Sequence, residues 1–264
     1  MMSGKSLLVG LLSVLPMFGS SLLSGLSGGP VYWYNGDLDA FAASTNGDGI
    51  FPNEVGGGDG SASTWDDFTV GPSGAVITGL FSFDELRGGS PTVFQDANWQ
   101  ILNGAPGASG TTVVASGSGA SAVTTDTQQA IGGIGDPYAG ELYLTEVTGL
   151  NIDLAGGTYW LSLAPDVSEG AFYNVTTAGA NGVGTPQAQD GNSYFSCVAC
   201  AENPVDAPAI DYVSNPSVGD TADGGHIDFS MGVEGVQASP EPGTLALAGL
   251  GLLLAGIAKR RRAA

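Results

Sequence analysis

The sequence predicts an all-β protein that folds as a single antiparallel β-sandwich. Glycine supplies 44 of the 264 residues while the hydrophobic content is an ordinary 42%, and Lys, Arg, Glu and Gln are scarce. This composition disfavours helices and favours short strands joined by turns. No interior stretch repeats apolar residues at a helical period. Apolar or alternating runs instead recur roughly every 8 to 15 residues, separated by Gly, Pro and Asp, as in sandwiches.

About ten segments have the pattern of a strand. The first is 65–70, between a glycine loop at 56–58 and a turn at 71–74. In the next, 75–83, Leu80 lies on one face and Ile77, Phe81 and Phe83 lie near the other, which implies burial on both sides. The remaining strands are expected at 92–102, at 111–115 and 121–125 as weaker edge strands, and at 142–147, 151–154, 158–163, 171–177, 194–198 and 227–236.

The N-terminal segment has the layout of a signal peptide. Lys5 precedes an apolar run at 7–15 that is too short to span a membrane, and small residues crowd positions 19–29. Cleavage after Ser27 or after Ser21 fits the requirement for small residues before the cut. We therefore expect a signal helix within residues 1–27, followed by a secreted domain over residues 28–238.

The C-terminal segment, residues 239–264, combines three features in order. Pro240, Glu241 and Pro242 form a rigid tripeptide, whose prolines fix φ and cannot donate backbone hydrogen bonds, so that it stays extended and can be bound by an enzyme. An apolar run at 243–258 can form a hydrophobic transmembrane helix. A basic cluster of four residues closes the chain and fixes orientation on the cytoplasmic side; it consists of Lys259, Arg260, Arg261 and Arg262.

This tail resembles that of the PEP-CTERM proteins of Gram-negative bacteria. The resemblance covers about a tenth of the chain and implies recognition by exosortase, a membrane protease-transpeptidase, after export with the help of signal peptidase. It further implies transient anchoring in the inner membrane and a final place at the cell surface or in the extracellular matrix, with exopolysaccharide as a partner.

Charge excludes one class of function for the body. Of the 26 acidic and six basic residues, residues 28–238 hold 25 acids and only Arg87 as a base, so their net charge is near −24. Such a segment repels phosphate backbones, which argues against nucleic-acid binding. The acids cannot be neutralised by internal salt bridges, and most are expected on solvated faces and loops.

Two short segments of the body are similar to elements found in many PEP-CTERM proteins. They are Asp67-Phe68-Thr69 with the following Ile77-Thr78-Gly79, and the later run from Gly157 to Ser162. In that family these elements belong to a jelly-roll-like or lectin-like antiparallel sandwich. The resemblance therefore implies a jelly-roll-like body.

The sequence gives little support for catalysis, and we expect no enzyme. The only histidine, His226, stands at a strand entrance, and no Gly-x-Ser-x-Gly turn is present to hold a nucleophile. The run at 44–50 begins like an EF-hand loop but has Val55 where the bidentate Glu belongs. A looser calcium site remains open, using carboxylates near the glycine-rich loop: Asp48, Asp59, Asp66 and Asp67.

The two cysteines, Cys197 and Cys200, predict a local disulfide. The chain is expected to enter an oxidising compartment, and the surrounding residues lack the helix that a redox CxxC motif needs. Such a short loop removes little chain entropy, so the bridge would mainly fix one loop.

Together these features favour an exported, exosortase-processed surface or matrix protein with a structural or adhesive role in an exopolysaccharide layer. The alternative is a lectin-like carbohydrate-binding module, with or without calcium, in which Trp99 or Trp160 stacks on sugar. A secreted hydrolase ranks third, because paired carboxylates are plentiful but are also the background of the whole chain.

Overall fold

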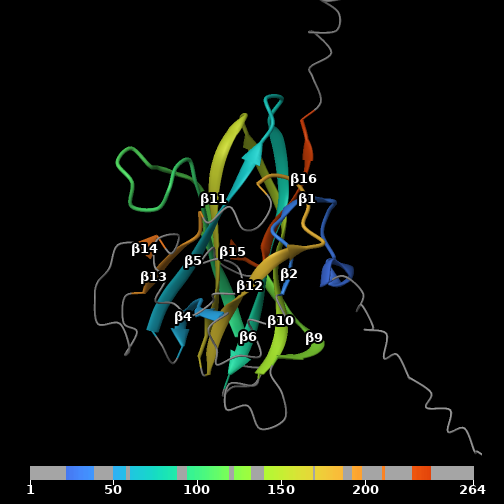
Figure 1. Ribbon diagram of the computed structural model, residues 1–264, viewed down its shortest axis with the longest axis vertical. Coiled ribbons are helices and arrows are strands. Elements are labelled where there is room, and N and C mark those ends of the chain that lie inside the picture. The colour runs from blue at the N-terminus through green and yellow to red at the C-terminus, as the bar shows by residue number, and fades with distance from the viewer. Residues whose placement is uncertain are drawn as a thin grey trace, which may run out of the picture.

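The computed structural model describes residues 22–38, 50–57, 60–87, 94–118, 122–131, 140–168, 170–186, 192–197, 210–211 and 228–238. These segments form one short 3₁₀ helix, η1 (Leu22–Gly25), and strands that assemble into two facing sheets (Figure 1). The predicted all-β antiparallel sandwich is confirmed. Both expected terminal helices, apart from residues 22–27, fall outside the described part of the chain, and the jelly-roll topology stays a prediction.

The first sheet has nine strands. Its main path runs β1 (Val31–Tyr34), β16 (Met231–Gln237), β6 (Ala75–Arg87), β10 (Gly140–Leu154) and β9 (Ala122–Ile131). The other strands join through β12 (Ala171–Ala180), which pairs with β6 and with three short strands: β2 (Asp37–Leu38), β3 (Ile50–Pro52) and β15 (Asp228–Phe229). This sheet therefore brings together strands from both ends of the body.

The second sheet has seven strands. Their order is β14 (Ile210–Asp211), β13 (Tyr194–Cys197), β5 (Gly60–Val70), β4 (Glu54–Gly57), β11 (Gly157–Val167), β7 (Phe94–Leu102) and β8 (Val113–Ser118). β5 also pairs directly with β11, with Val70 opposite Gly157 and Asp67 opposite Trp160. Asp67-Phe68-Thr69 and the run from Gly157 to Ser162 thus lie on neighbouring strands, while Ile77-Thr78-Gly79 lies on β6 of the other sheet. The one parallel pairing among the described strands joins β4 to β11.

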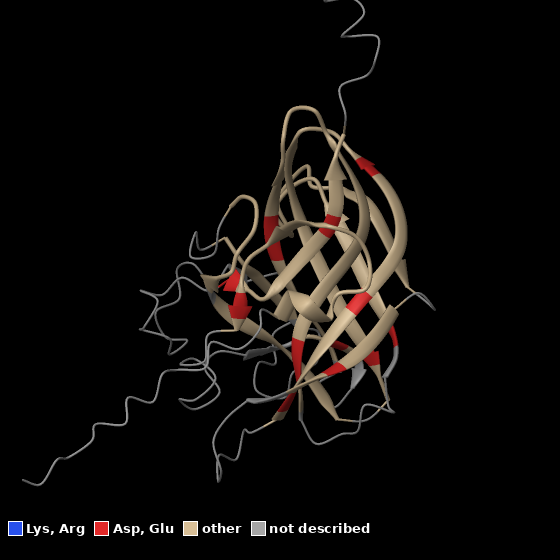
Figure 2. Cartoon of the chain, turned by 90° about the vertical axis from the view of Figure 1, so that its right-hand side faces the viewer, with Lys and Arg blue, Asp and Glu red and all other residues tan. Residues whose placement is uncertain are grey.

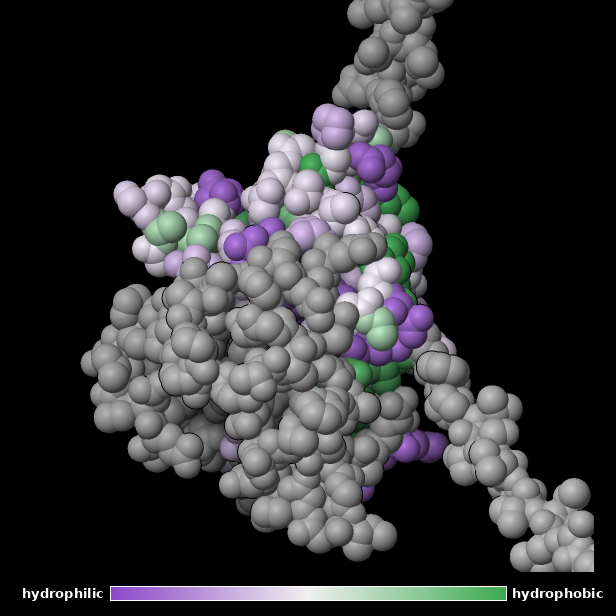
Figure 3. Space-filling model, in the orientation of Figure 1, coloured by the Kyte–Doolittle hydropathy of each residue, from purple (hydrophilic) through white to green (hydrophobic). Residues whose placement is uncertain are grey.

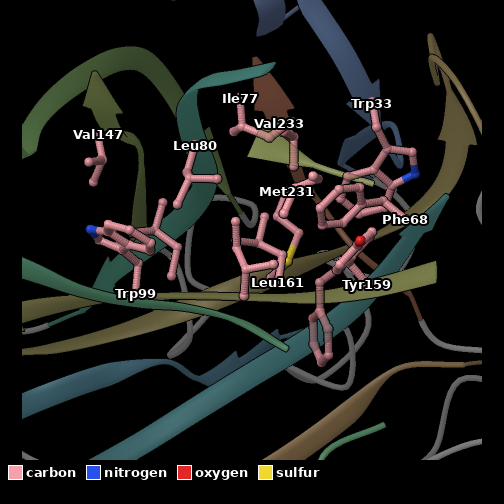
Figure 4. Packing of buried hydrophobic residues seen from close by; sticks show 14 of the residues in the cluster. Trp33, Phe68, Ile77, Leu80, Trp99, Val147, Tyr159, Leu161, Met231 and Val233 are labelled. Atoms are coloured by element: carbon pink, nitrogen blue, oxygen red, sulfur yellow. The ribbon is translucent and has the colours of Figure 1, made fainter. Parts of the chain in front are cut away.

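The space between the sheets is filled by apolar side chains from both of them (Figure 4). Phe68 on β5 packs its ring against Trp33 of β1 and Tyr159 of β11, with ring centroids 5.6 and 5.8 Å apart. Ile77 and Leu80 of β6 enter the same cluster from the opposite sheet. Alternation along each strand places these residues inward, which explains why the segments fold as two stacked sheets.

Strand β6 is buried on both faces, as its sequence predicts. Thr78 is an extra residue in the pairing with β16, because Gly79 is opposite Glu234 and Ile77 is opposite Gly235, so the alternation of β6 shifts there. The register with β10 shifts at the same point, where residues 149–151 of β10 face Thr78. As a result Ile77 and Leu80 both point into the inter-sheet core, whereas Phe81 and Phe83 lie in a second cluster on the outer face of the nine-stranded sheet. The sequence alternation placed Ile77 with the two phenylalanines, and the bulge separates them.

Other elements differ from the sequence expectation in extent. The segments 142–147 and 151–154 form the single strand β10, whose register shifts between Thr148 and Ile152 with Gly149 at φ +73°. The expected strand 227–236 is divided into β15 and β16 at Ser230. Strands β1 to β4 were not predicted. β8 and β9 lie at sheet edges, as expected for the two weaker segments.

Candidate functional site

Asp66, one of the candidate calcium ligands, lies inside the sandwich. It is 1% exposed on the inward face of β5, where its Oδ2 accepts a hydrogen bond from the backbone N–H of Phe229 at 2.7 Å. Its Oδ1 accepts from the N–H of Asp67 at 2.9 Å. Burial, and next the charge of Asp228, raise the pKa of Asp66 well above its ordinary value. The carboxyl therefore joins β5 to β15 across the interior.

Asp67 points to the opposite face of β5, because successive side chains of a strand alternate. It stands opposite Trp160 in the register and is 5% exposed. No group of three residues that could hold a metal ion occurs within the described part of the chain. Asp48 and Asp59 lie outside that part, so the calcium site stays a prediction.

Asp84 is a buried carboxyl that the sequence did not single out. Its Oδ1 accepts a hydrogen bond from Asn53 Nδ2 at 2.8 Å, and its Oδ2 accepts from Ser82 Oγ at 2.6 Å. Burial raises its pKa from 3.8 to about 7, although these two donors oppose the shift. The one sequence feature that could have indicated its burial is its position directly after Phe83, at the end of the predicted strand 75–83.

Asn53 joins this carboxyl of β6 to the seven-stranded sheet. Its Nδ2 also donates to the carbonyl of Leu163 on β11 at 2.8 Å, and its Oδ1 accepts from the N–H of Thr64 on β5 at 3.3 Å. Asn53 itself is fully buried. The interior therefore contains a polar bridge from β6 to the seven-stranded sheet, beside the apolar cluster.

Several further carboxyls of the described residues are buried, while the expectation that most acids are solvated stays a prediction, because many of them lie outside those residues. Glu54, Glu85, Asp228 and Glu234 are at most 1% exposed. Glu54 Oε2, for example, accepts from the N–H of Phe172 at 2.8 Å. Acidic positions are spread along the strands of the sandwich (Figure 2). Arg87 is the only Lys or Arg in residues 28–238, and at Glu54 a backbone amide serves as the donor in place of a cation.

The two candidate sugar-stacking tryptophans lie on opposite faces of one sheet. Trp99 of β7 belongs to the inter-sheet core, where a Cβ added to Gly117 would meet its ring at 2.8 Å (Figure 4). Trp160 of β11 faces outward and packs edge-on against Tyr194, with ring centroids 4.8 Å apart. The two rings therefore cannot form one platform.

The end of β16 fixes the point at which the chain leaves the body. Gln237 is opposite Ala75 in the sheet, and the N–H of the next residue, Ala238, donates to the carbonyl of Gly74 at 2.9 Å. The side chain of Gln237 donates to the same carbonyl at 3.0 Å. Ala238 also lines a shallow pocket of about 330 Å³ with the turns that contain Pro72 and Ala155. The sorting residues follow directly in sequence, outside the described part.

Residues 240–262 match the PEP-CTERM protein-sorting motif. The match begins two residues beyond Ala238 and contains Pro240, Glu241, Pro242 and the basic cluster at 259–262. The motif indicates an exported protein that is targeted to an exosortase and anchored transiently through its tail. No curated protein and no solved structure matches the chain. Of the described residues, none forms a helix long and apolar enough to cross a membrane.

The remaining candidates are not tested by the structure. Cys197 ends β13, but its side chain, Cys200 and His226 all lie outside the described residues. The disulfide between the two cysteines therefore stays a prediction.

Proposed function

We propose that this protein is exported by a signal peptide within residues 1–27 and that an exosortase then removes its tail near Pro240 and Pro242. The acidic sandwich would remain as a non-catalytic structural or adhesive component of an exopolysaccharide layer at a Gram-negative cell surface. The sorting match at residues 240–262 carries the processing part of this proposal. The role in the layer is implied by the resemblance to PEP-CTERM proteins.

The position of the tail supports processing of a folded body. Ala238, the last described residue, donates a hydrogen bond to Gly74 just after β16, and the tripeptide begins two residues later in sequence. Cleavage at the tripeptide therefore removes none of the described strands. Cleavage there leaves both sheets intact.

The buried carboxyls support a non-catalytic body. Acid–base catalysis needs carboxyls with raised pKa values that can touch a substrate. The two such aspartates in the core, Asp66 and Asp84, are 1% and 0% exposed and hydrogen-bonded to the fold itself. Their pKa shifts are explained by enclosure within the sandwich.

Intact-mass analysis tests the processing. In a host with its exosortase we expect a mature chain that lacks Lys259 and the three arginines, and in a host without the enzyme a chain that retains them. Replacing Pro240, Glu241 and Pro242 by alanine should preserve the tail in both hosts. The matched control, Ser239→Ala, lies outside the motif and should be processed. A mature chain that keeps the arginines despite exosortase contradicts the proposal.

The alternative carbohydrate-binding role has one supporting observation. Trp65, Trp160 and Tyr194 share the outer face of the seven-stranded sheet, because Tyr194 is opposite Trp65 and Trp160 is opposite Asp67, two residues along β5. Trp65 and Tyr194 are partly exposed. Saturable binding on a glycan array that disappears in Trp65→Ala, but persists in Val114→Ala on the edge strand β8, would favour this role. No binding to any glycan would reject it.

A further inference from the structure

The first described residues form a cover on the outer face of the nine-stranded sheet. Leu22, at the start of η1, is 7% exposed and belongs to the cluster of Phe81, Phe83 and Leu144. Leu23 and Leu26 pack against the same cluster. On the face drawn in Figure 3, hydrophobic side chains are visible along the flank where Figure 1 draws β1 and η1. This short segment therefore shields apolar side chains that β6 and β10 direct away from the main core.

A buried carboxylate holds the residues that follow η1. Glu146 of β10 is 5% exposed, and its Oε1 accepts from the N–H groups of Ser27 and Gly28, both at 2.9 Å. Its Oε2 accepts from Ser27 Oγ at 2.6 Å. All three donors come from two consecutive residues. The segment thus supplies the donors that a cation would otherwise provide.

A second carboxylate, Glu234 of β16, fits closely under the same segment. A Cβ added to Gly28 would collide with Glu234 Oε2, and one added to Gly29 would meet Thr78 Oγ1 at 2.8 Å. The carbonyl of Pro30 then accepts from the N–H of Gly235 at 2.8 Å, and β1 begins at Val31. From Leu22 to β1 the chain is continuous and is held to the sheet by its leucines and by these hydrogen bonds, while Ser24, Gly25, Ser27, Gly28 and Pro30 are exposed.

From this packing we infer that signal peptidase cuts between Ser21 and Leu22, and that residues 22–28 stay as the first segment of the mature fold. The inference rests on the proposed export. Of the two candidate bonds, the one after Ser27 lies inside the segment that these contacts hold, whereas the one after Ser21 lies immediately before it.

The rival cut after Ser27 would remove more stabilising contacts from the fold than it would create. It would place the new amino group of Gly28 beside Glu146 Oε1, a favourable charge pair in an acidic body. It would also remove Ser27, which supplies two of the three donors to Glu146, and three leucines that cover Phe81, Phe83 and Leu144. The exposed cluster would then be an apolar patch on the mature surface.

Intact mass and N-terminal sequencing of the exported protein test this inference. We expect the mature chain to begin at Leu22. A chain that begins at Gly28, or at any other residue, overturns the assignment. If such a chain lacks the basic tail, the proposed function stands while the inference fails. A chain that keeps Met1 overturns both.

A matched pair of variants gives a second test. Ser21→Leu places a bulky residue directly before the inferred cut and should cause unprocessed precursor to accumulate. Ser27→Leu leaves the inferred cut unchanged, so its mature chain should still begin at Leu22. Ser27→Leu should also melt a few degrees lower, because Glu146 loses the Ser27 hydroxyl. Normal processing of Ser21→Leu together with blocked processing of Ser27→Leu would overturn the inference.

Discussion

At the scale of single residues, the unusual feature is a set of buried carboxyls in a body with almost no cations. Burial of an ionised carboxylate is costly unless donors surround it. Asp84 meets this cost with one amide and one hydroxyl donor, and Asp66 meets it with two backbone amides. In both residues the pKa is raised. The native state therefore binds protons more tightly than the unfolded chain does.

Asp84 predicts how stability depends on pH. Its pKa of about 7 in the fold exceeds the unfolded value of about 3.9, so its contribution is complete below the unfolded pKa. That contribution is lost as pH rises through 7, by up to roughly 1.4 kcal/mol per pH unit. Asp84→Asn can still accept from Asn53 and can donate to Ser82. We therefore expect the variant to gain stability over the native protein as pH rises.

Urea unfolding from pH 4 to pH 8 measures this effect. The difference in unfolding free energy between Asp84→Asn and the native protein should grow by about 2–4 kcal/mol over that range. Asp153→Asn removes an exposed carboxyl from β10 and serves as the control, with a small and constant difference. A difference for Asp84→Asn that does not change with pH would contradict the prediction.

At the scale of elements, close approaches between strands depend on particular glycines. Gly232 of β16 lies so near β1 and β6 that an added Cβ would be 2.6 Å from the carbonyl of Trp33 and would collide with the ring of Phe81. Gly157, at the start of β11, has room for a Cβ, whose nearest neighbour would be the Tyr159 ring at 3.7 Å. The fold therefore requires a glycine at position 232 but not at position 157.

Gly232→Ala is expected to destabilise the fold by about 2 kcal/mol or more, because a backbone carbonyl cannot move aside as a side chain can. Gly157→Ala should change stability by less than about 0.5 kcal/mol. Equilibrium unfolding in urea compares the two. Equal effects of the two substitutions would show that the approach of β16 to β1 is looser than described.

The short η1 element also carries a prediction. Leu22→Ala removes a side chain that is 7% exposed and packed on Phe81, Phe83 and Leu144, so we expect a loss of about 2 kcal/mol, the low end for buried leucines. Ser24→Ala, on the exposed side of η1, should have little effect. Thermal unfolding distinguishes the outcomes, and an unchanged melting temperature for Leu22→Ala would mean that η1 contributes nothing to the body.

The elements also show which parts of the fold were predictable. The segments that became β5, β6, β7 and β11 alternate apolar residues, so their sequences predicted them. β10 was predicted as two strands, because a glycine such as Gly149 often ends a strand. In the structure Gly149 has a positive φ and lies within the register shift, and pairing with β6 continues on both sides of it. The bulge at Thr78 was not predicted, since it arises from the pairing of β6 with β16, a strand far away in the sequence.

At the scale of the whole molecule, residues 28–238 carry a net charge near −24. Self-repulsion of this size opposes compaction, and salt screens it over about 10 Å at 0.1 M. Since Asp66 and Asp84 have raised pKa values, acid also reduces the charge inside the body. Salt and low pH should therefore both weaken the self-repulsion and stabilise the folded body.

Raising NaCl from about 20 mM to about 500 mM should raise the melting temperature by several degrees at pH 8. The rise should be smaller at pH 5, where more carboxyls are protonated. Differential scanning calorimetry at the two pH values measures both effects. A melting temperature that does not depend on salt at pH 8 would show that the charges are already compensated within the fold.

The sequence by itself determined the sorting signal, the charge and the fold class of this protein. A sorting motif is a linear signal, and the composition that favours strands is a sum over residues, so neither needs a folded neighbour. Only the tertiary structure decided which acids are enclosed. Asp84 and Asp153 both lie on strands, yet one is buried by the facing sheet and the other is exposed. Burial depends on which segments pack over a strand, and residues 22–28 are one such segment. The sequence of a single strand does not specify those segments.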